Sequence, residues 1–273
     1  MIQVEERYIS LLTDFGFKRI FGTAINKDLL ICFLNSLFDG KQVVKDVSYL
    51  NPEHVGDVYT DRKAIFDVYC EGENGEKFIV EMQNAYQTYF KDRSLFYSTF
   101  PIREQAALLN FDMNEEAFEK EKIRHSVQLC DTATHKVFYD KLEFIYVEIA
   151  KFNKSLEELE TLYDKWLYAL KNLYKLTQRP KELCDKVFDR LFEEAEIAKF
   201  TPQELREYEA SKIAYRDIKN SVDTAKREGI AEGMEKKSHE IAKKMLTKGM
   251  DEATVMEITG LPAELIQKLK AEM

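Results

Sequence analysis

Two short apolar runs joined by a polar loop constrain the fold of this chain more than any other feature. The runs cover residues 64–70 and 77–83, and each has the length and the β-branched or aromatic content of a strand. The loop at 71–76 contains Asn74-Gly75, a dipeptide typical of hairpin turns. The sequence therefore predicts a β-hairpin over residues 64–83.

The hairpin carries two acids that could act together. Asp67 lies in the middle of an apolar run, where an unpaired buried carboxylate would be costly. Side chains alternate between the two faces of a strand, so Glu81 shares a face with Ile79 and Gln83. A hairpin can bring Asp67 and Glu81 to one sheet face, and converging carboxylates favour a hard divalent cation. The alternative is that Glu81 and Gln83 form the solvent-facing edge of an amphipathic strand.

The rest of the chain divides near residue 152 into a part with strands and a part without. Residues 4–38 have helical periodicity, and 42–150 indicate a mixed sheet with at least one packed helix. After residue 152 all the apolar patterns are helical. The expected elements are strands at 42–50, 63–70, 77–83, 124–130, 137–139 and 142–149, and helices at 13–22, 26–38, 84–101, 155–177, from Pro180 and from Thr201-Pro202.

The end of the chain is charged and then compact. The stretch 226–237 indicates a solvated helix or a linker, weakened by Gly229 and Gly233 at about 1 kcal/mol each. Two short helices joined through residues 259–262 could form a helix-turn-helix-like hairpin. From Lys226 to the end, nine basic residues stand against nine acidic ones. This balance favours a packing or oligomerisation element over DNA binding by this part alone.

Composition bounds the class of protein. The net charge of −9 gives no support for non-specific binding of nucleic acid, although a local basic groove is compatible with it. The four cysteines and four histidines are scattered and form no zinc or disulfide pattern. No apolar run reaches the length of a membrane span, and no signal peptide is visible. We expect a cytoplasmic protein without a membrane partner.

Several ordered motifs together resemble the PD-(D/E)XK nuclease family transposases, also described as recombination-promoting nucleases. The resemblance covers nearly the whole chain, and its order is more specific than any single motif. The motifs are residues 14–22 (Asp-Phe-Gly-Phe-Lys-x-Ile-Phe-Gly), Asp67, Glu81-Met82-Gln83, Tyr89, Arg93, Tyr97, Gln105, 138–146, 152–154, 166–173 and 258–261.

The resemblance implies a restriction-endonuclease-like fold, an α/β (α+β) mixed sheet flanked by helices and followed by an all-helical C-terminal extension. It also implies metal-dependent cutting of DNA phosphodiesters. The implied domains are a nuclease-like domain at 1–152, a helical extension packed on it at 153–225, and a charged helix with a helix-turn-helix-like tail at 226–273.

The resemblance also assigns roles to the residues of the site. It implies that Asp67 and Glu81 bind Mg²⁺ or Mn²⁺ and that Asp14 is a third acid. Gln83 stands where many relatives of the wider superfamily have lysine, and it could position water by hydrogen bonds but gives less electrostatic help. From the residues alone, Asp14 is equally compatible with a helix N-cap. Lys18, one helical turn later, could contact a DNA phosphate or belong to a solvated helix face.

The helix expected at 84–101 carries a further candidate. Its aromatic stripe is typical of core packing, while Tyr89, Arg93 or Tyr97 could face the substrate. We take Arg93 as a second DNA contact.

One departure from the family pattern bears on activity. Relatives have a longer segment after the glutamine that matches Gln105, with an apolar strand in the sheet core. Here residues 105–111 pass directly to a polar stretch, so that strand is missing, or it is reduced to 106–111, or the segment 123–130 replaces it. A lost strand would expose a sheet edge.

Three functions follow from these observations. The first is a Mg²⁺-dependent DNA endonuclease. The second is an inactive, strand-deleted relative that binds DNA or protein. The third is a structural homo-oligomer formed through the C-terminal helices.

Overall fold

The computed structural model describes residues 6–38, 40–50, 53–54, 64–65, 67–84, 95, 105–113, 115 and 117–271. The chain divides into two compact units, residues 1–218 and 219–273. The helix predicted at 84–101 falls outside the described residues, apart from Leu95. The expected boundary at residue 152 stays a prediction.

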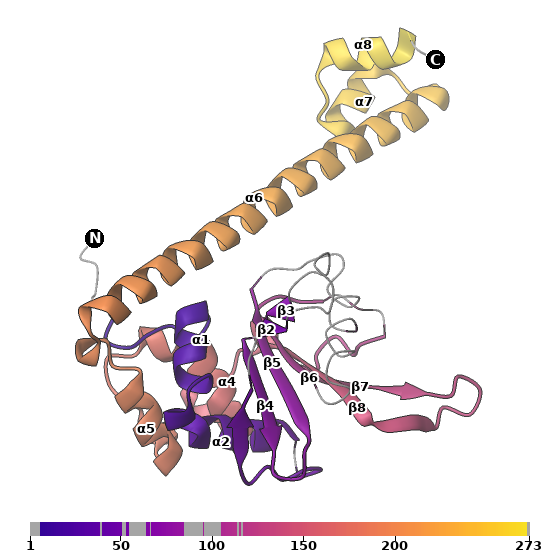
Figure 1. The fold of residues 1–273 in the computed structure, drawn as a ribbon. Coiled ribbons are helices and arrows are strands. Elements are labelled where there is room, and N and C mark those ends of the chain that lie inside the picture. The colour runs from indigo at the N-terminus through magenta and orange to yellow at the C-terminus, as the bar shows by residue number, and fades with distance from the viewer. Residues whose placement is uncertain are drawn as a thin grey trace. The chain divides into compact units, whose positions relative to one another are not determined.

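Helices and a mixed sheet make up the first unit (Figure 1). Its strands are β1 (Val47–Tyr49), β2 (Glu53–His54), β3 (Ala64–Ile65), β4 (Val68–Gly72), β5 (Lys77–Gln83), β6 (Gln105–Leu109), β7 (Arg124–Cys130) and β8 (Val137–Glu148). Its α-helices are α1 (Asp14–Phe21), α2 (Lys27–Phe38), α4 (Leu162–Asn172) and α5 (Lys186–Glu194), and α6 (Pro202–Thr247) begins in it. Short 3₁₀ helices lie at Ala24–Asn26, Ile149–Lys151, Leu156–Glu158, Leu173–Lys175, Lys181–Leu183 and Ile197–Lys199.

The main sheet has six strands in the order β1-β4-β5-β6-β8-β7. β5, β6 and β8 run parallel to one another, and the neighbours on either side pair antiparallel. β2 and β3 form a separate antiparallel pair. This mixed sheet with its helices confirms the predicted restriction-endonuclease-like α/β fold.

Of the three alternatives for the strand after Gln105, the missing strand is wrong, and the structure has a short strand close to the reduced one expected at 106–111. β6 covers Gln105–Leu109 and pairs with β5 on one side and β8 on the other. It therefore occupies the middle of the sheet next to the hairpin. The segment at 124–130 forms β7 at the edge and does not replace it. The sheet beside the candidate acids is complete.

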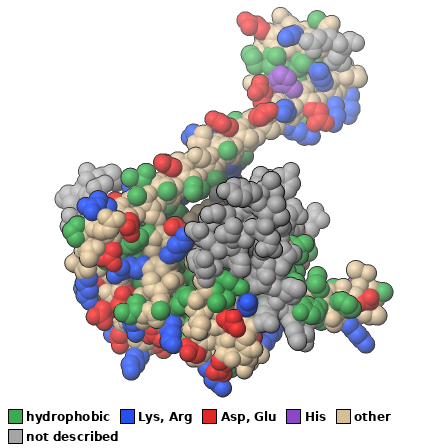
Figure 2. All heavy atoms as spheres, viewed as in Figure 1, with side chains coloured by type: hydrophobic (Ala, Val, Ile, Leu, Met, Phe, Trp, Pro, Cys, Tyr) green, Lys and Arg blue, Asp and Glu red, His purple; other side chains and the backbone are tan. Residues whose placement is uncertain are grey.

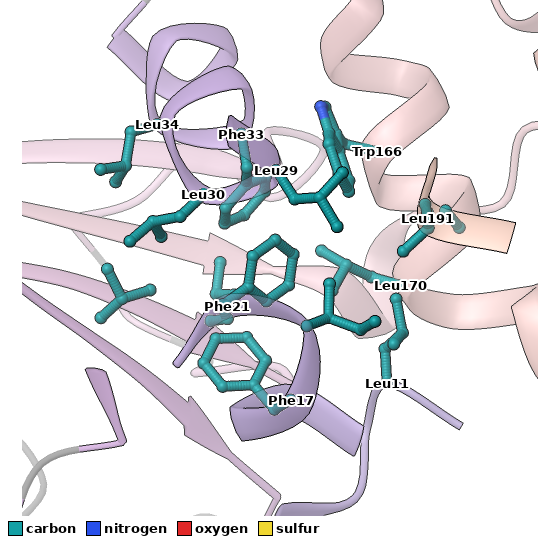
Figure 3. Packing of buried hydrophobic residues seen from close by; sticks show 14 of the residues in the cluster. Leu11, Phe17, Phe21, Leu29, Leu30, Phe33, Leu34, Trp166, Leu170 and Leu191 are labelled. Atoms are coloured by element: carbon teal, nitrogen blue, oxygen red, sulfur yellow. The ribbon is translucent and has the colours of Figure 1, made fainter. Parts of the chain in front are cut away.

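One continuous core joins the helices to one face of the sheet. Val80 and Leu108 from the sheet belong to the same buried cluster as α1, α2, α4 and α5. Figure 3 shows the aromatic centre of this cluster, where the ring of Phe21 lies 5.1 Å from that of Phe33 and 5.7 Å from that of Trp166. This packing fixes α1 against the sheet, and α1 carries two of the candidate site residues.

The opposite face of the sheet has a smaller apolar cluster around Leu109, Phe144 and Tyr146. Beyond this cluster the β7–β8 hairpin projects from the body (Figures 1 and 2). Phe138 near its tip is 82% exposed. On the face shown in Figure 2, the coloured Lys and Arg side chains are interspersed with those of Asp and Glu, so the described residues form no patch of a single sign there.

Two predicted elements are shorter than expected because other parts of the chain use their backbone groups. Residues 6–12 are not helical, since Ile9 N donates to Ala195 O at 3.0 Å and Ile197 N donates to Arg7 O at 3.0 Å. The strand predicted at 42–50 is reduced to β1. Val44 is not part of it, because its N–H and C=O bond the side-chain amide of Asn35 at 2.7 and 2.8 Å.

The long helix α6 runs without a break from Pro202 to Thr247, through Gly229 and Gly233. Its start is capped reciprocally: Thr201 N donates to Glu204 Oε2 at 2.8 Å and Glu204 N donates to Thr201 Oγ1 at 3.2 Å. The two glycines lower helix propensity but their cost is spread over 46 residues. Of the two interpretations of residues 226–237, the structure has the solvated helix.

The second unit packs the end of α6 against α7 (Glu252–Thr259) and α8 (Ala263–Ala271). Its core contains Ala242, Val255 and Ile266. Gly260 ends α7 with φ +68°, a left-handed conformation that suits glycine. The helical hairpin predicted around residues 259–262 is therefore present.

No single helix within the described residues is both long and apolar enough to cross a membrane, and only α1 taken with residues 24–38, bent by 63°, meets the length and composition of a span.

Candidate active site

The β4–β5 hairpin positions the two predicted acids. Val68 pairs with Val80 in the antiparallel ladder, so one further step of the register places Asp67 opposite Glu81. Asp67 itself lies in the bend just before β4. Its Oδ2 accepts a hydrogen bond from Met82 N at 2.8 Å, which ties the carboxylate to the strand that bears Glu81. The structure brings these two residues together as the sequence predicted.

The Asp67 carboxyl is largely enclosed, with 23% of its side chain exposed. Burial raises its pKa above the usual value, because a carboxylate loses solvation there. The Met82 N–H and the Lys18 ammonium act against that shift, and the nearby Asp14 adds to it. The Met82 N–H and Lys18 therefore do not fully offset the solvation that the Asp67 carboxylate loses on burial.

Glu81 is buried, with 7% of the residue exposed, and it lies on the same sheet face as Ile79 and Gln83. The interpretation of Glu81 as a solvent-facing edge residue is therefore wrong. β5 is flanked by β4 and β6, so it is an interior strand of the sheet. Gln83 is half-buried at the end of β5, where its carbonyl oxygen accepts from Asn110 N at 2.9 Å.

Helix α1 brings a third acid and a lysine to the hairpin. Lys18 Nζ lies 2.7 Å from Asp14 Oδ1, one helical turn back, and 3.8 Å from Asp67 Oδ1. Burial alone would lower the pKa of Lys18, but Asp14 and Asp67 outweigh it and the pKa is raised. The N-cap of α1 is Thr13, whose Oγ1 accepts from Gly16 N at 3.1 Å, so Asp14 is free of that role.

Gly16 explains how α1 comes so close to the chain before it. A Cβ at this position would lie 2.1 Å from Ser10 O, which no side chain can tolerate. The glycine of the motif at 14–22 is thus required by a close backbone approach inside the helix that carries Asp14 and Lys18.

A set of asparagines at the ends of β5 and β6 was missed by the sequence analysis. Asn84 Nδ2 donates to Leu12 O at 3.0 Å, and Asn110 Nδ2 donates to Tyr215 Oη at 3.1 Å. These bonds fasten the ends of β5 and β6 to the segment before α1 and to α6. An asparagine directly after each strand was the available signal.

A second buried polar group was also missed. Glu148 at the end of β8 is fully buried, and its Oε1 accepts from Met113 N at 2.6 Å. Its Oε2 lies 2.8 Å from Lys151 Nζ and 3.0 Å from His125 Nε2. Through Met113 this network holds the loop that leaves β6, whose first residue, Asn110, bonds Gln83.

A groove of about 740 Å³ lies between α1 and the start of α6. Asp14, Lys18 and Arg19 line one side, and Glu204 and Glu207 line the other. Lys18 therefore lines this groove and also contacts Asp67. Arg93, the second predicted DNA contact, lies outside the described residues.

The donor set can be compared with the implied divalent cation. Asp67 and Glu81 offer only oxygen, which suits Mg²⁺ or Mn²⁺. Among the residues that the structure describes, no three His, Cys, Asp or Glu side chains stand close enough to hold a metal together. Mg²⁺ commonly uses one or two carboxylates and completes its shell with water and phosphate oxygens. A two-carboxylate site fits that habit.

Comparisons with known proteins agree with this geometry. The model of the PD-(D/E)XK nuclease family transposases matches residues 11–225, a range that includes all of the candidate site. Nucleases of this type generally use divalent metals. The model of the Rpn/YhgA-like nuclease family C-terminal HTH domain matches residues 235–271, and a helix-turn-helix domain suggests DNA binding. Neither the curated proteins nor the solved structures give a match. The chain belongs to the PD-(D/E)XK nuclease family transposases.

Proposed function

We propose that the protein is a metal-dependent DNA endonuclease that hydrolyses phosphodiester bonds, with Asp67 and Glu81 binding Mg²⁺ or Mn²⁺. The observation that carries this proposal is the 2.8 Å hydrogen bond from Met82 N to Asp67 Oδ2. It fixes one acid against the strand that bears the other. The family membership supports the reaction class.

The chain's own residues would divide the work of hydrolysis. A divalent cation held here supplies a water of lowered pKa and stabilises the negative charge of the phosphate in the transition state. The Gln83 amide can both donate and accept hydrogen bonds, so it can orient the attacking water. Asp14 is the third acid of the site, and Lys18 and Arg93 contact DNA phosphates.

Hydrolysis exchanges one bond to phosphorus for another. The water oxygen forms a bond to phosphorus and one phosphorus–oxygen ester bond breaks. The water loses a proton, and the departing alkoxide oxygen takes one up. No oxidant or further substrate is needed.

The test is a cutting assay with supercoiled plasmid DNA and Mg²⁺ or Mn²⁺. We expect the wild-type protein to nick or linearise the plasmid, and Asp67→Asn and Glu81→Gln each to reduce the rate by about a hundredfold or more. Asp46→Asn is the matched control, because Asp46 is an exposed acid that pairs with Lys27 at 2.7 Å away from the hairpin. Equal cutting by the wild type and Asp67→Asn, or none by either, would contradict the proposal.

A second candidate is an inactive relative that binds DNA without cutting it. The observation in its favour is Gln83, a neutral residue where many relatives of the wider superfamily carry lysine. The complete sheet removes the other argument for inactivity, the missing strand. Salt-dependent retention of DNA with no cutting under any divalent metal would support this candidate, whereas nicking that Glu81→Gln abolishes would exclude it.

A further inference from the structure

The charges of the candidate site do not balance on the hairpin alone. Asp67 and Glu81 are acids and Gln83 is neutral, so the end of the hairpin that carries them has negative charge and no cation of its own, although its proposed substrate is a polyanion. Within the described part of the chain, the cation that pairs with Asp67 is Lys18, from a different element. Lys18 is far from the hairpin in the sequence, so this ion pair could not be predicted from the sequence.

The two oxygens of Asp67 are held from opposite elements. The β5 backbone donates to Oδ2 through Met82 N, and the Lys18 ammonium lies 3.8 Å from Oδ1. The backbone of α1 is fixed, since Phe17, Ile20 and Phe21 are fully buried around Lys18. The Lys18 side chain is nevertheless 41% exposed, so its ammonium borders both the acid and solvent.

A surface ion pair with Asp14 alone does not account for this arrangement. An exposed pair at i,i+4 contributes little to stability, and it needs no second acid from another element. Lys18 instead reaches past its own helix to the acid that the hairpin presents. An ammonium is a compact point charge with three donors, which suits contact with both a phosphate oxygen and a water.

We propose that Lys18 is a catalytic residue that supplies, from α1, the positive charge that β5 lacks at Gln83. Its ammonium contacts the scissile phosphate and the attacking water, and the ion pair with Asp67 holds it in position. This inference rests on the proposed nuclease function. It goes beyond a general phosphate contact, because it makes positions 18 and 83 interchangeable sources of one charge.

The test exchanges the charge between the two positions. We expect Lys18→Met to reduce the rate of plasmid cutting by about a hundredfold. Adding Gln83→Lys to Lys18→Met should raise that reduced rate by about tenfold or more. Lys27→Met is the matched control, because Lys27 also pairs with one acid at 2.7 Å and its side chain is 47% exposed. The control should cut like the wild type.

Binding of Mn²⁺ alone and thermal unfolding provide readouts that do not depend on cutting. Removing a positive charge beside Asp67 should leave Mn²⁺ affinity equal to that of the wild type or several-fold tighter, with a melting temperature close to that of Lys27→Met. Loss of cutting together with a lower melting temperature or weaker Mn²⁺ binding would mean a structural role and would overturn the inference.

The outcomes separate this inference from the function on which it rests. If the wild type does not cut, or Asp67→Asn does, the nuclease proposal fails. If the wild type cuts and Asp67→Asn does not, but Lys18→Met cuts normally, only the role of Lys18 fails. A folded double variant with no recovery would also overturn the exchange of charge.

Discussion

Gly16 and Gly229 both lie inside helices, yet the space around them is opposite. A Cβ at position 16 would lie 2.1 Å from Ser10 O and 2.9 Å from Thr13 Oγ1, whereas a Cβ at position 229 meets nothing within 4 Å. In the sequence both are simply glycines in helical patterns. Only the packing of the chain before α1 distinguishes them.

We predict that alanine has opposite effects at these two glycines. Gly16→Ala should lower the free energy of unfolding by about 1–3 kcal/mol, because a backbone oxygen must move to admit the methyl group. Gly229→Ala should stabilise α6 by up to about 1 kcal/mol, because alanine restricts the unfolded chain and fits the helix. Denaturant unfolding of both variants would measure this. A Gly16→Ala protein as stable as the wild type would contradict the close approach.

At this scale the placement of Asp67 opposite Glu81 was predictable from the sequence, and the contacts of these acids with other elements were not. The alternation of residues 77–83 and the lone acid in an apolar run were sufficient to pair Asp67 with Glu81. The contact between Lys18 and Asp67 was not predictable, because it depends on how α1 packs against the sheet. Whether Asp14 or Thr13 capped α1 was likewise settled only by the hydrogen bond from Gly16 N to Thr13 Oγ1.

Among the elements, β6 shows how a central strand can be overlooked. Its sequence, Gln105–Leu109, contains two alanines, which have a low preference for strands. Both of its neighbours are parallel strands from distant parts of the sequence. Parallel pairing leaves no local hairpin signal, whereas the β4–β5 hairpin was evident from its Asn-Gly turn. The local hairpin could therefore be predicted, whereas the central strand stayed one of three alternatives.

Helix α4 starts at a capping box that gives a pH-dependent prediction. Asp164 N donates to Thr161 Oγ1 at 3.0 Å, Thr161 N donates back to Asp164 Oδ2 at 3.2 Å, and Lys154 Nζ lies 2.9 Å from the same oxygen. Burial alone would raise the pKa of Asp164, but Lys154 and Thr161 outweigh it and the pKa is lowered. The folded state therefore favours the ionised carboxylate.

We predict that Asp164→Asn lowers the free energy of unfolding by about 1 kcal/mol at neutral pH. A lowered folded pKa gives stability that is present above the pKa of the unfolded chain and is lost as the pH falls through the folded value. The difference between wild type and variant should therefore shrink in acid. Chemical unfolding over a pH series measures it, with Asp223→Asn on the exposed face of α6 as control. A difference that is independent of pH would contradict the ionic role.

For the whole molecule, two family models match separate parts of the chain. The nuclease-like match covers residues 11–225, and the helix-turn-helix match covers 235–271. The net charge of −9 says little about either, because binding depends on which charges are available locally. The nine basic and nine acidic residues from Lys226 onward also cancel in number, but only some of the lysines form ion pairs with these acids.

The lysines of the second unit differ in whether an acid already neutralises them. Lys236 pairs with Glu232, Lys237 with Glu240, and Lys270 with Glu252, at 2.5, 3.0 and 2.7 Å. Within residues 235–271, the range of the helix-turn-helix match, three other exposed lysines have no ion-pair partner among the described residues: Lys243, Lys248 and Lys268. An unpaired ammonium is free to neutralise a DNA phosphate, whereas a paired one must first lose its carboxylate.

We predict that Lys243, Lys248 and Lys268 contribute more to DNA binding by the full chain than the paired lysines do. Replacing all three with glutamine should weaken binding to duplex DNA and should lower the slope of log K against log salt by up to about 0.9 for each lost phosphate contact. Replacing Lys236, Lys237 and Lys270 changes the net charge equally and should have a smaller effect. Fluorescence anisotropy without divalent metal, over a series of salt concentrations, measures both. Equal losses in the two triple variants would mean that net charge, and not the free ammonium groups, governs binding.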